Sequence, residues 1–412
     1  MSNEHAMLVV LAAAALSPLV GGLVFGPRVP PVVLEILVGI LIGPHVLGLA
    51  SRTDVVDFFA TVGLSFLFFM AGMEIDFHRI QGTPLNLGLA TWCTSIALGL
   101  GMGTLLQGAG VVISSLLVGI AFTTTALGTL MPILRDNDEL ETRFGALVVG
   151  AGAVGEFGPI VLISTLLSST SLSASFGAIL TFIALAMVIA VTALKIHPPN
   201  VMRVIARSMH TSAQLPIRLT VLLIGGLVFL SADIGLDAVL GAFAAGVIVS
   251  LAAGRDRVEL DHKLEGIAFG VFIPVFFVAT GVSFDLPSLG TREALWRLPL
   301  FVAMFLLVRG APALAFYRQV LPSLNDRIDL ALMTSTQLPL VVAITAIGLA
   351  THRMHPYTAS ALIGAGMVSV LLFPMIAEAQ RSRGRSRSGD QATGDLPAGD
   401  AEVEPAGSAA RV

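Results

Sequence analysis

Long apolar segments follow one another along almost the whole of this chain, and they constrain its fold more than any other feature. A helix needs about 20 mostly apolar residues to cross the hydrocarbon core of a membrane. By that measure the sequence predicts about thirteen spans, at 6–25, 30–49, 56–75, 85–106, 110–134, 142–168, 173–194, 216–233, 236–253, 265–284, 296–316, 327–350 and 358–378. The segments do not alternate between apolar and polar residues, which excludes an outer-membrane barrel. We therefore expect an all-α polytopic membrane protein.

The charged residues are too few to cover a soluble protein of this length. Asp, Glu, Lys and Arg make up 12% of the 412 residues, whereas an ordinary soluble domain has about 25%. The single cysteine, Cys93, lies in an apolar segment and the eight histidines show no ligand spacing, so we expect neither a metal centre nor a cofactor. The sequence also offers no nucleophile with an adjacent base. We predict a protein that is not an enzyme and whose partners are the lipid bilayer and small ions, not nucleic acid.

Positive charges are distributed unequally between the two sides of the membrane. With thirteen spans, 18 of the 23 Lys and Arg residues fall on the side of the C-terminus, four fall on the other side, and Arg309 lies within a span. Because cytoplasmic loops carry the excess of Lys and Arg, we expect a cell inner (plasma) membrane protein with its N-terminus outside and its C-terminus in the cytoplasm. Residues 380–412 are rich in Arg and Ser and then in Gly, Ala, Pro and Glu, which predicts a disordered cytoplasmic tail.

Two short patterns recur along the chain at offsets of 209 and 211 residues. They are Phe68, Gly72 and Asp76 with Phe277, Gly281 and Asp285, and Thr123, Thr124 and Thr125 with Thr334, Ser335 and Thr336. Seven predicted spans separate the partners, and because seven is odd, the second copy enters the membrane upside down. Inverted-topology repeats of this kind are typical of secondary transporters. We expect a first half at 1–170, a connecting helix and basic loop at 171–215, a second half at 216–379 and the tail at 380–412.

The recurring Thr-rich segments lie in the middle of predicted spans, beside Gly or Pro. They comprise Thr123, Thr124 and Thr125 in the first half and Thr334, Ser335, Thr336 and Gln337 in the second. Thr and Ser side chains can satisfy backbone groups that are freed where a helix is interrupted. The pair therefore predicts two broken helices that cross at an ion site near the membrane midplane. The alternative is ordinary Thr and Gly in helix–helix contacts, which membrane proteins favour in any case.

Three ionisable residues lie away from the ends of the predicted spans, where a buried charge is costly unless it is paired or functional. Glu156 lies midway along a Gly-rich span, and Pro159 would leave the carbonyl of Gly155 without its helical bond. A buried carboxylate beside free carbonyls suits a monovalent cation, and a proton can compete with the cation for it. Arg309 keeps its charge, so we expect either a structural tie to the interrupted helices or a counter-charge close to Glu156. For Glu35 we expect a structural pair.

Several of these segments resemble signatures of a known transporter family. Pro30 to Pro44, with the sequence PPVVLEILVGILIGP, is similar to the second helix of the monovalent cation:proton antiporter-2 family, the membrane domain of the sodium/hydrogen exchangers. The segments 63–76, 241–246 and 274–285 resemble its third, ninth and tenth helices. The resemblance covers residues 7–378 and implies a homodimer with a rigid dimerisation domain and a moving core, made of spans four to six and eleven to thirteen.

The resemblance also implies roles for the buried residues. Glu156 occupies the position of the family's cation-binding aspartate, Gly155 stands where many members carry Asp, Asn or Gln, and Arg309 lies in the helix that carries a buried Lys or Arg. We therefore expect a secondary active transporter that exchanges a monovalent cation, Na⁺ or K⁺, for H⁺ by alternating access. One carboxylate in place of two predicts electroneutral exchange. The alternative is a transport-inactive membrane sensor or scaffold that retains the fold.

Overall fold

The computed structural model describes residues 3–24, 30–74, 82–166, 172–195, 208, 211–236, 238–252 and 257–394. All regular elements in these ranges are helices, which confirms the expected all-α fold. In the first half they are α1 (Asn3–Val24), α2 (Pro31–Ile42), α3 (Asp54–Glu74), α5 (Thr83–Gly108), α6 (Ser115–Ala121), α7 (Leu127–Asp136) and α8 (Arg143–Leu166), followed by α9 (Leu172–Lys195).

The second half contains α11 (Leu215–Asp233), α12 (Ala238–Ala252), α13 (Arg257–Ile267), α14 (Ile273–Val282), α15 (Leu286–Leu289), α16 (Arg292–Phe305), α17 (Ala311–Phe316), α18 (Leu324–Thr334), α19 (Pro339–Ala350) and α20 (Pro356–Gly394). Two π-helical turns, at Ala268–Phe272 and Leu306–Gly310, join α13 to α14 and α16 to α17.

Within the described residues, nine helical stretches are long and apolar enough to cross a membrane. Three further predicted spans coincide with shorter apolar helices, at Pro31–Ile42, Leu180–Ile189 and Ala238–Ala252, and the fifth coincides with the pair α6 and α7. The predicted span at 30–49 is too long, because α2 ends at Ile42. Gly43 is extended there (φ −64°, ψ 172°), as steric contact with the following proline favours. The count of thirteen stays a prediction.

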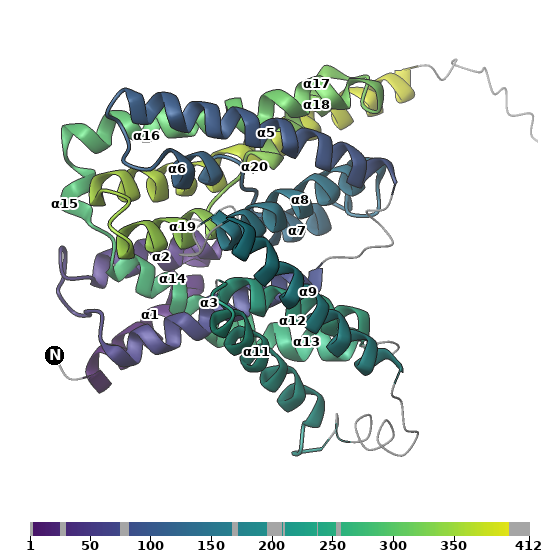
Figure 1. Cartoon of the computed structure of the whole chain (residues 1–412). Helices are drawn as coiled ribbons and strands as arrows, with labels where there is room; N and C mark the ends of the chain where they lie inside the picture. The colour runs from purple at the N-terminus through teal and green to yellow at the C-terminus, as the bar shows by residue number, and fades with distance from the viewer. Residues whose placement is uncertain are drawn as a thin grey trace, which may run out of the picture.

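The helices form two groups. A core group, α5 to α8 and α16 to α20, fills the upper part of Figure 1, and a flanking group, α1 to α3 and α11 to α14, fills the lower part. Because the core group contains the predicted spans four to six and eleven to thirteen, it has the helix composition expected for a core domain. The two groups meet along α3, α14 and α19.

Reciprocal packing in the flanking group relates the two halves of the chain. Helix α2 packs on α14 and, in the same way, α12 packs on α3. A Cβ atom on Gly281 would lie 2.8 Å from Cα of Gly39, and one on Gly246 would lie 3.0 Å from Cα of Gly72. Gly72 and Gly281 are the partners that the sequence repeat predicts. Their equivalent close contacts are what an inverted repeat requires, since each half supplies one helix to each pair.

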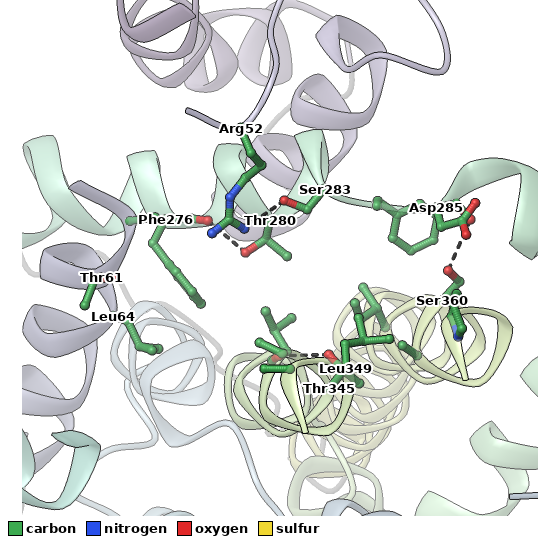
Figure 2. A pocket seen from close by; sticks show the side chains of 18 residues that line it. Arg52, Thr61, Leu64, Phe276, Thr280, Ser283, Asp285, Thr345, Leu349 and Ser360 are labelled. Carbon is green, nitrogen blue, oxygen red and sulfur yellow. Dashed lines mark hydrogen bonds between the residues drawn. The ribbon is translucent and has the colours of Figure 1, made fainter. Parts of the chain in front are cut away.

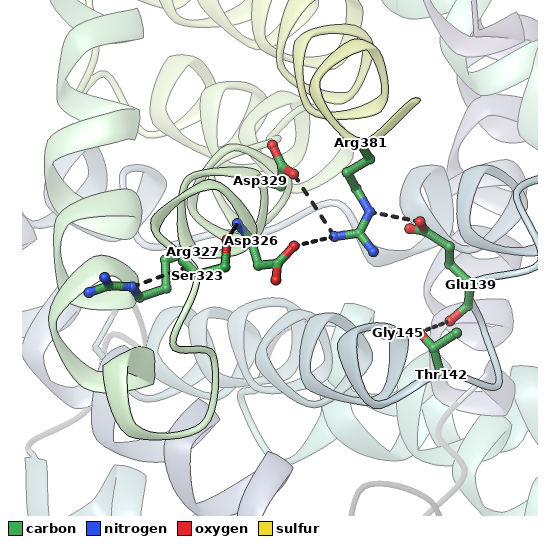
Figure 3. A network of polar contacts seen from close by, with 8 residues as sticks. All are labelled: Glu139, Thr142, Gly145, Ser323, Asp326, Arg327, Asp329 and Arg381. Carbon is green, nitrogen blue, oxygen red and sulfur yellow. Dashed lines mark hydrogen bonds and ion pairs between the residues drawn. The ribbon is translucent and has the colours of Figure 1, made fainter. Parts of the chain in front are cut away.

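The last helix is longer than expected. It continues to Gly394, whereas the sequence predicts that disorder begins at residue 380. Arg381, just beyond the apolar part of the helix, donates to Glu139 (2.7 Å) and to Asp326 (3.2 Å) (Figure 3). Its guanidinium also lies 3.7 Å from the ring centre of Phe144. These contacts hold the first turn after the membrane span against the core group. Residues 395–412 lie outside the described residues.

Candidate ion-binding site

Two interrupted helices cross inside the core group. Helix α6 ends at Ala121 and α7 begins at Leu127, while α18 ends at Thr334 and α19 begins at Pro339. All seven residues of the predicted crossover are buried, and the structure brings them together: Thr123, Thr124, Thr125, Thr334, Ser335, Thr336 and Gln337. The broken, crossed helices expected from the sequence are therefore present.

Hydrogen bonds join one break to the other. The N–H of Ala126 donates to the carbonyl of Thr336 (2.8 Å), and the Thr125 hydroxyl donates to the carbonyl of Thr334 (2.6 Å). The amide group of Gln337 donates to the carbonyl of Phe122 (3.1 Å). Each break thus satisfies backbone groups of the other, which is how non-helical backbone is tolerated at membrane depth.

Hydroxyl side chains satisfy the carbonyls at the ends of α6 and α18. Thr123 and Thr124 donate to the carbonyls of Ile120 (2.8 Å) and Ala121 (3.0 Å). In the other break, Ser335 donates to the carbonyl of Ala331 (2.7 Å). The same carbonyls also accept from the backbone N–H groups of Thr123 (2.9 Å), Thr124 (3.4 Å) and Ser335 (3.1 Å), so each hydroxyl supplies a second hydrogen bond in the last turn of its helix. The abundance of Thr and Ser at this point of the sequence therefore has a physical cause.

Glu156 caps the start of the half-helix α7. Its side chain is 6% exposed, and Oε2 accepts a hydrogen bond from the N–H of Leu127 (3.2 Å). Helix N-termini carry a partial positive charge that stabilises a carboxylate. Pro159 has the effect expected from the sequence: the carbonyl of Gly155 is left free of its helical bond and accepts from the N–H of Thr125 (3.0 Å).

Arg309 lies at the centre of the crossing, with 1% of its side chain exposed. Nε and Nη2 donate to the Thr125 hydroxyl (3.0 and 2.8 Å), and Nη2 also donates to the carbonyl of Ala151 (2.9 Å). Because Thr125 in turn donates to the carbonyl of Thr334, one guanidinium ties α8 to both broken helices. Of the two roles expected for Arg309, these contacts correspond to the structural tie.

Gly155 leaves room for this guanidinium. A Cβ atom at position 155 would collide with Nη2 of Arg309 and with the Thr125 hydroxyl. Many members of the resembled family carry a side chain at this position. In this chain the guanidinium of Arg309 occupies the space that such a side chain would need. A residue pair separated by 154 positions cannot be recognised as neighbours from one sequence.

Ser369 is a crossover residue that the sequence did not suggest. It accepts from the N–H of Gln337 (3.0 Å) and donates to the carbonyl of the same residue (2.9 Å). It caps the second break as Glu156 caps the first, and it lies 213 positions after Glu156. That offset is close to those of the sequence repeat, so the repeat was the signal that could have located it.

Two cavities lie between the core group and the flanking group, at opposite ends of α3 and α14. One, of about 440 Å³, is lined by Thr61 and Leu64 near the start of α3 and by residues near the end of α14. Figure 2 shows Arg52 and Ser283 on one of its walls, with Thr345 and Ser360 on the other. Ser360 donates to the carbonyl of Asp285 (3.1 Å) and so connects α20 to the residue that caps the start of α15.

The other cavity, of about 540 Å³, contains Glu156. It opens between Met70 near the end of α3 and Ile273 at the start of α14, and it reaches Pro339 of the second break.

Glu35 lines the same cavity. This differs from the structural pair that the sequence predicts for Glu35, because its side chain faces the cavity from α2 and has no hydrogen bond or ion pair within the described part of the chain.

These features define a polytopic helical membrane protein with two crossed, broken helices and a buried carboxylate at the crossing, the architecture of many secondary transporters. The family described as "Sodium/hydrogen exchanger, transmembrane" matches residues 10–378. The chain belongs to this family.

Relatives and one solved structure agree with that assignment. The putative Na(+)/H(+) antiporter YjbQ of Bacillus subtilis is 26% identical over 91% of this chain, which spans 62% of that protein's length. A Na(+)/H(+) antiporter of Enterococcus hirae is 24% identical over 84% of this chain, and the match covers 91% of that protein's length. The structure of the sodium proton antiporter MjNhaP1 from Methanocaldococcus jannaschii aligns with a TM-score of 0.64 at 17% identity, over 95% of this chain and 99% of that one. The last likeness shows a shared fold.

Proposed function

We propose that this protein is a secondary active transporter that exchanges a monovalent cation, Na⁺ or K⁺, for H⁺ by alternating access. The observation that carries the proposal is the position of Glu156, which is buried, caps a broken helix and lines a cavity that enters from one side. A carboxylate there can hold either a proton or a cation, since each neutralises the same charge. Transport-inactive variants of the fold would not need such an accessible carboxylate.

The names of the relatives support both cations. One relative from Bacillus cereus, 26% identical over 64% of this chain, is described as a Na(+)/H(+)-K(+) antiporter. The two cavities at opposite ends of α3 and α14 fit alternating access, in which Glu156 faces one side at a time. The positive-charge bias of the sequence supports a cytoplasmic position for the cavity of Glu156, in an inner (plasma) membrane. We further propose that the protein works as a homodimer.

Replacing Glu156 by Gln tests the proposal. We expect Glu156→Gln to abolish exchange, because Gln keeps the shape and can neither release a proton nor offer charge to a cation. The measurement is internal pH in proteoliposomes, followed with a trapped dye after pulses of Na⁺, K⁺ and choline. Glu4→Gln, which changes an exposed carboxylate on α1, is the matched control and should exchange normally. Exchange at the wild-type rate by Glu156→Gln would show that another group binds the ion, and an inactive wild type would favour the sensor or scaffold.

A further inference from the structure

Glu35 is a buried carboxylate that lines the cavity of Glu156 and has no part in the proposed exchange. It lies on α2, with 4% of its surface exposed. No hydrogen bond or ion pair to Glu35 is present among the described residues, although the side chain faces a cavity of about 540 Å³. A charge that is withdrawn from water without a partner is costly. A function at this position therefore explains the carboxylate better than packing does.

The cavity places Glu35 opposite Glu156. Glu35 is on the wall supplied by the flanking group, and Glu156 is on the wall supplied by the core group. The other described residues that line the cavity carry no ionisable side chain, and most are Ala, Pro, Ile, Leu, Met or Phe. In such surroundings a charge on one carboxylate acts on an ion held near the other with little screening. The two acids therefore form a single electrostatic environment for an entering cation or proton.

We infer that Glu35 is a second ion-holding carboxylate on the approach to Glu156, which binds the entering cation or proton from this side before it reaches the crossing. This inference rests on the proposed exchange function. Glu35 belongs to the flanking group and Glu156 to the core group, so a movement of one group relative to the other would separate the two carboxylates. Glu35 should then act only while Glu156 faces this cavity.

Among the described residues, the opposite cavity has no equivalent free acid. The position in the second half that corresponds to Glu35 is Ala242, since Ala242 follows Glu35 by the same 207 residues that separate Gly39 from Gly246. Asp285 lines the opposite cavity, but its carboxylate caps α15 by accepting from the N–H of Ser288 (3.0 Å). The inferred site is therefore one-sided, and this asymmetry can be measured.

Glu35→Gln and Glu35→Asp test the inference in vesicles of defined orientation. Half-saturating concentrations of the transported cation and of H⁺ are measured separately at each membrane face, in right-side-out and in everted vesicles. We expect Glu35→Gln to raise these concentrations on the order of tenfold at the face that opens to the cavity of Glu156, and to leave the other face unchanged. Glu35→Asp, which keeps the charge, should restore much of the affinity. Glu4→Gln again serves as the matched control.

The melting temperature of the purified variant separates ion binding from a structural role. Removing an unpartnered buried charge should leave the melting temperature unchanged or raise it. A lowered melting temperature, an equal loss of affinity at both faces, or unchanged affinities at both faces would each overturn the inference. A wild-type protein without cation-dependent proton flux would instead refute the proposed function, so the two failures are distinguishable.

Discussion

At the scale of single residues, the centre of the molecule is arranged around the guanidinium of Arg309, whose hydrogen-bond acceptors in the described part of the chain are not carboxylates. Arg309 uses a hydroxyl and a carbonyl, Thr125 and Ala151, as acceptors. Charge-assisted hydrogen bonds are stronger than neutral ones, and they are stronger still where water is excluded. One side chain therefore stabilises the contact between the two breaks and α8, and Gly155 is the residue that makes its position possible.

Replacing Arg309 tests this tie. We expect Arg309→Ala to lower the free energy of unfolding by about 3 kcal/mol and to impair exchange, because the freed hydroxyl and carbonyl stay buried. Arg309→Lys keeps the charge and at most part of the bonding, so it should retain some activity. Thermal unfolding in detergent and proton flux in proteoliposomes are the measurements. An alanine variant with wild-type melting and wild-type flux would contradict the tie.

A double-mutant cycle with Gly155 provides the control for that result. Gly155→Ala alone should destabilise the protein, since the added Cβ collides with the guanidinium. In the Arg309→Ala background the collision with the guanidinium is gone and only that with the Thr125 hydroxyl remains, so the cost of Gly155→Ala should fall. Additive effects of the two substitutions would mean that the residues are not in contact.

At the scale of helices, glycines decide how closely α2 approaches α14 and α3 approaches α12. Each of these contacts is made through a backbone carbonyl: a Cβ on Gly281 would collide with that of Ile36, and one on Gly72 with that of Phe243. Within a membrane such close approach is the main source of helix association, since burial from lipid gives little hydrophobic driving force.

The effect of a single methyl group tests this packing. We expect Gly281→Ala to destabilise the protein by about 1–3 kcal/mol, because the backbone of α2 must move away. Gly225→Ala is the matched control: a Cβ there meets nothing within 4 Å, and alanine is the better helix former by about 1 kcal/mol. Thermal unfolding in detergent compares the two variants. Equal melting temperatures for them would show that α2 and α14 do not touch at Gly281.

At the scale of the whole molecule, the two groups of helices enclose cavities at opposite ends, and the core group carries a buried capping carboxylate, Glu156, at the helix crossing. If one carboxylate carries either one proton or one cation in each half of the cycle, no net charge crosses the membrane. Arg309 cannot contribute a proton to such a cycle. We infer that Glu35 acts only from one side, where it binds the entering ion before Glu156 does. It therefore does not add to the number of ions carried in each cycle.

Voltage tests this stoichiometry. A membrane potential acts on net transported charge with about 2.3 kcal/mol per charge per 100 mV. We expect the final cation gradient in proteoliposomes to be the same when the potential is clamped at different values with an ionophore. A gradient that shifts with the clamped voltage would mean that a second carboxylate carries an ion across the membrane in each cycle, with Glu35 the first to examine.

The sequence by itself determined the helical membrane fold, the repeat and the broken helices. Apolar length, Lys and Arg bias, and Thr-rich interruptions are local properties, and each can be read without knowing what lies opposite. The sequence also located Glu156 and Arg309, because a charge inside an apolar segment is conspicuous wherever the segment packs.

Only the tertiary structure decided what these residues face. Glu35 lies in a cavity shared with Glu156 instead of in a structural pair, and Arg309 occupies the space beside Gly155. Ser369 caps the second break. Helix α20 continues past residue 380, where Arg381 contacts the core group. Each of these outcomes depends on residues far apart in the chain. In a span that is apolar on every side, periodicity does not indicate which face meets a neighbouring helix, a cavity or lipid, because the hydrophobic pattern is the same for all three.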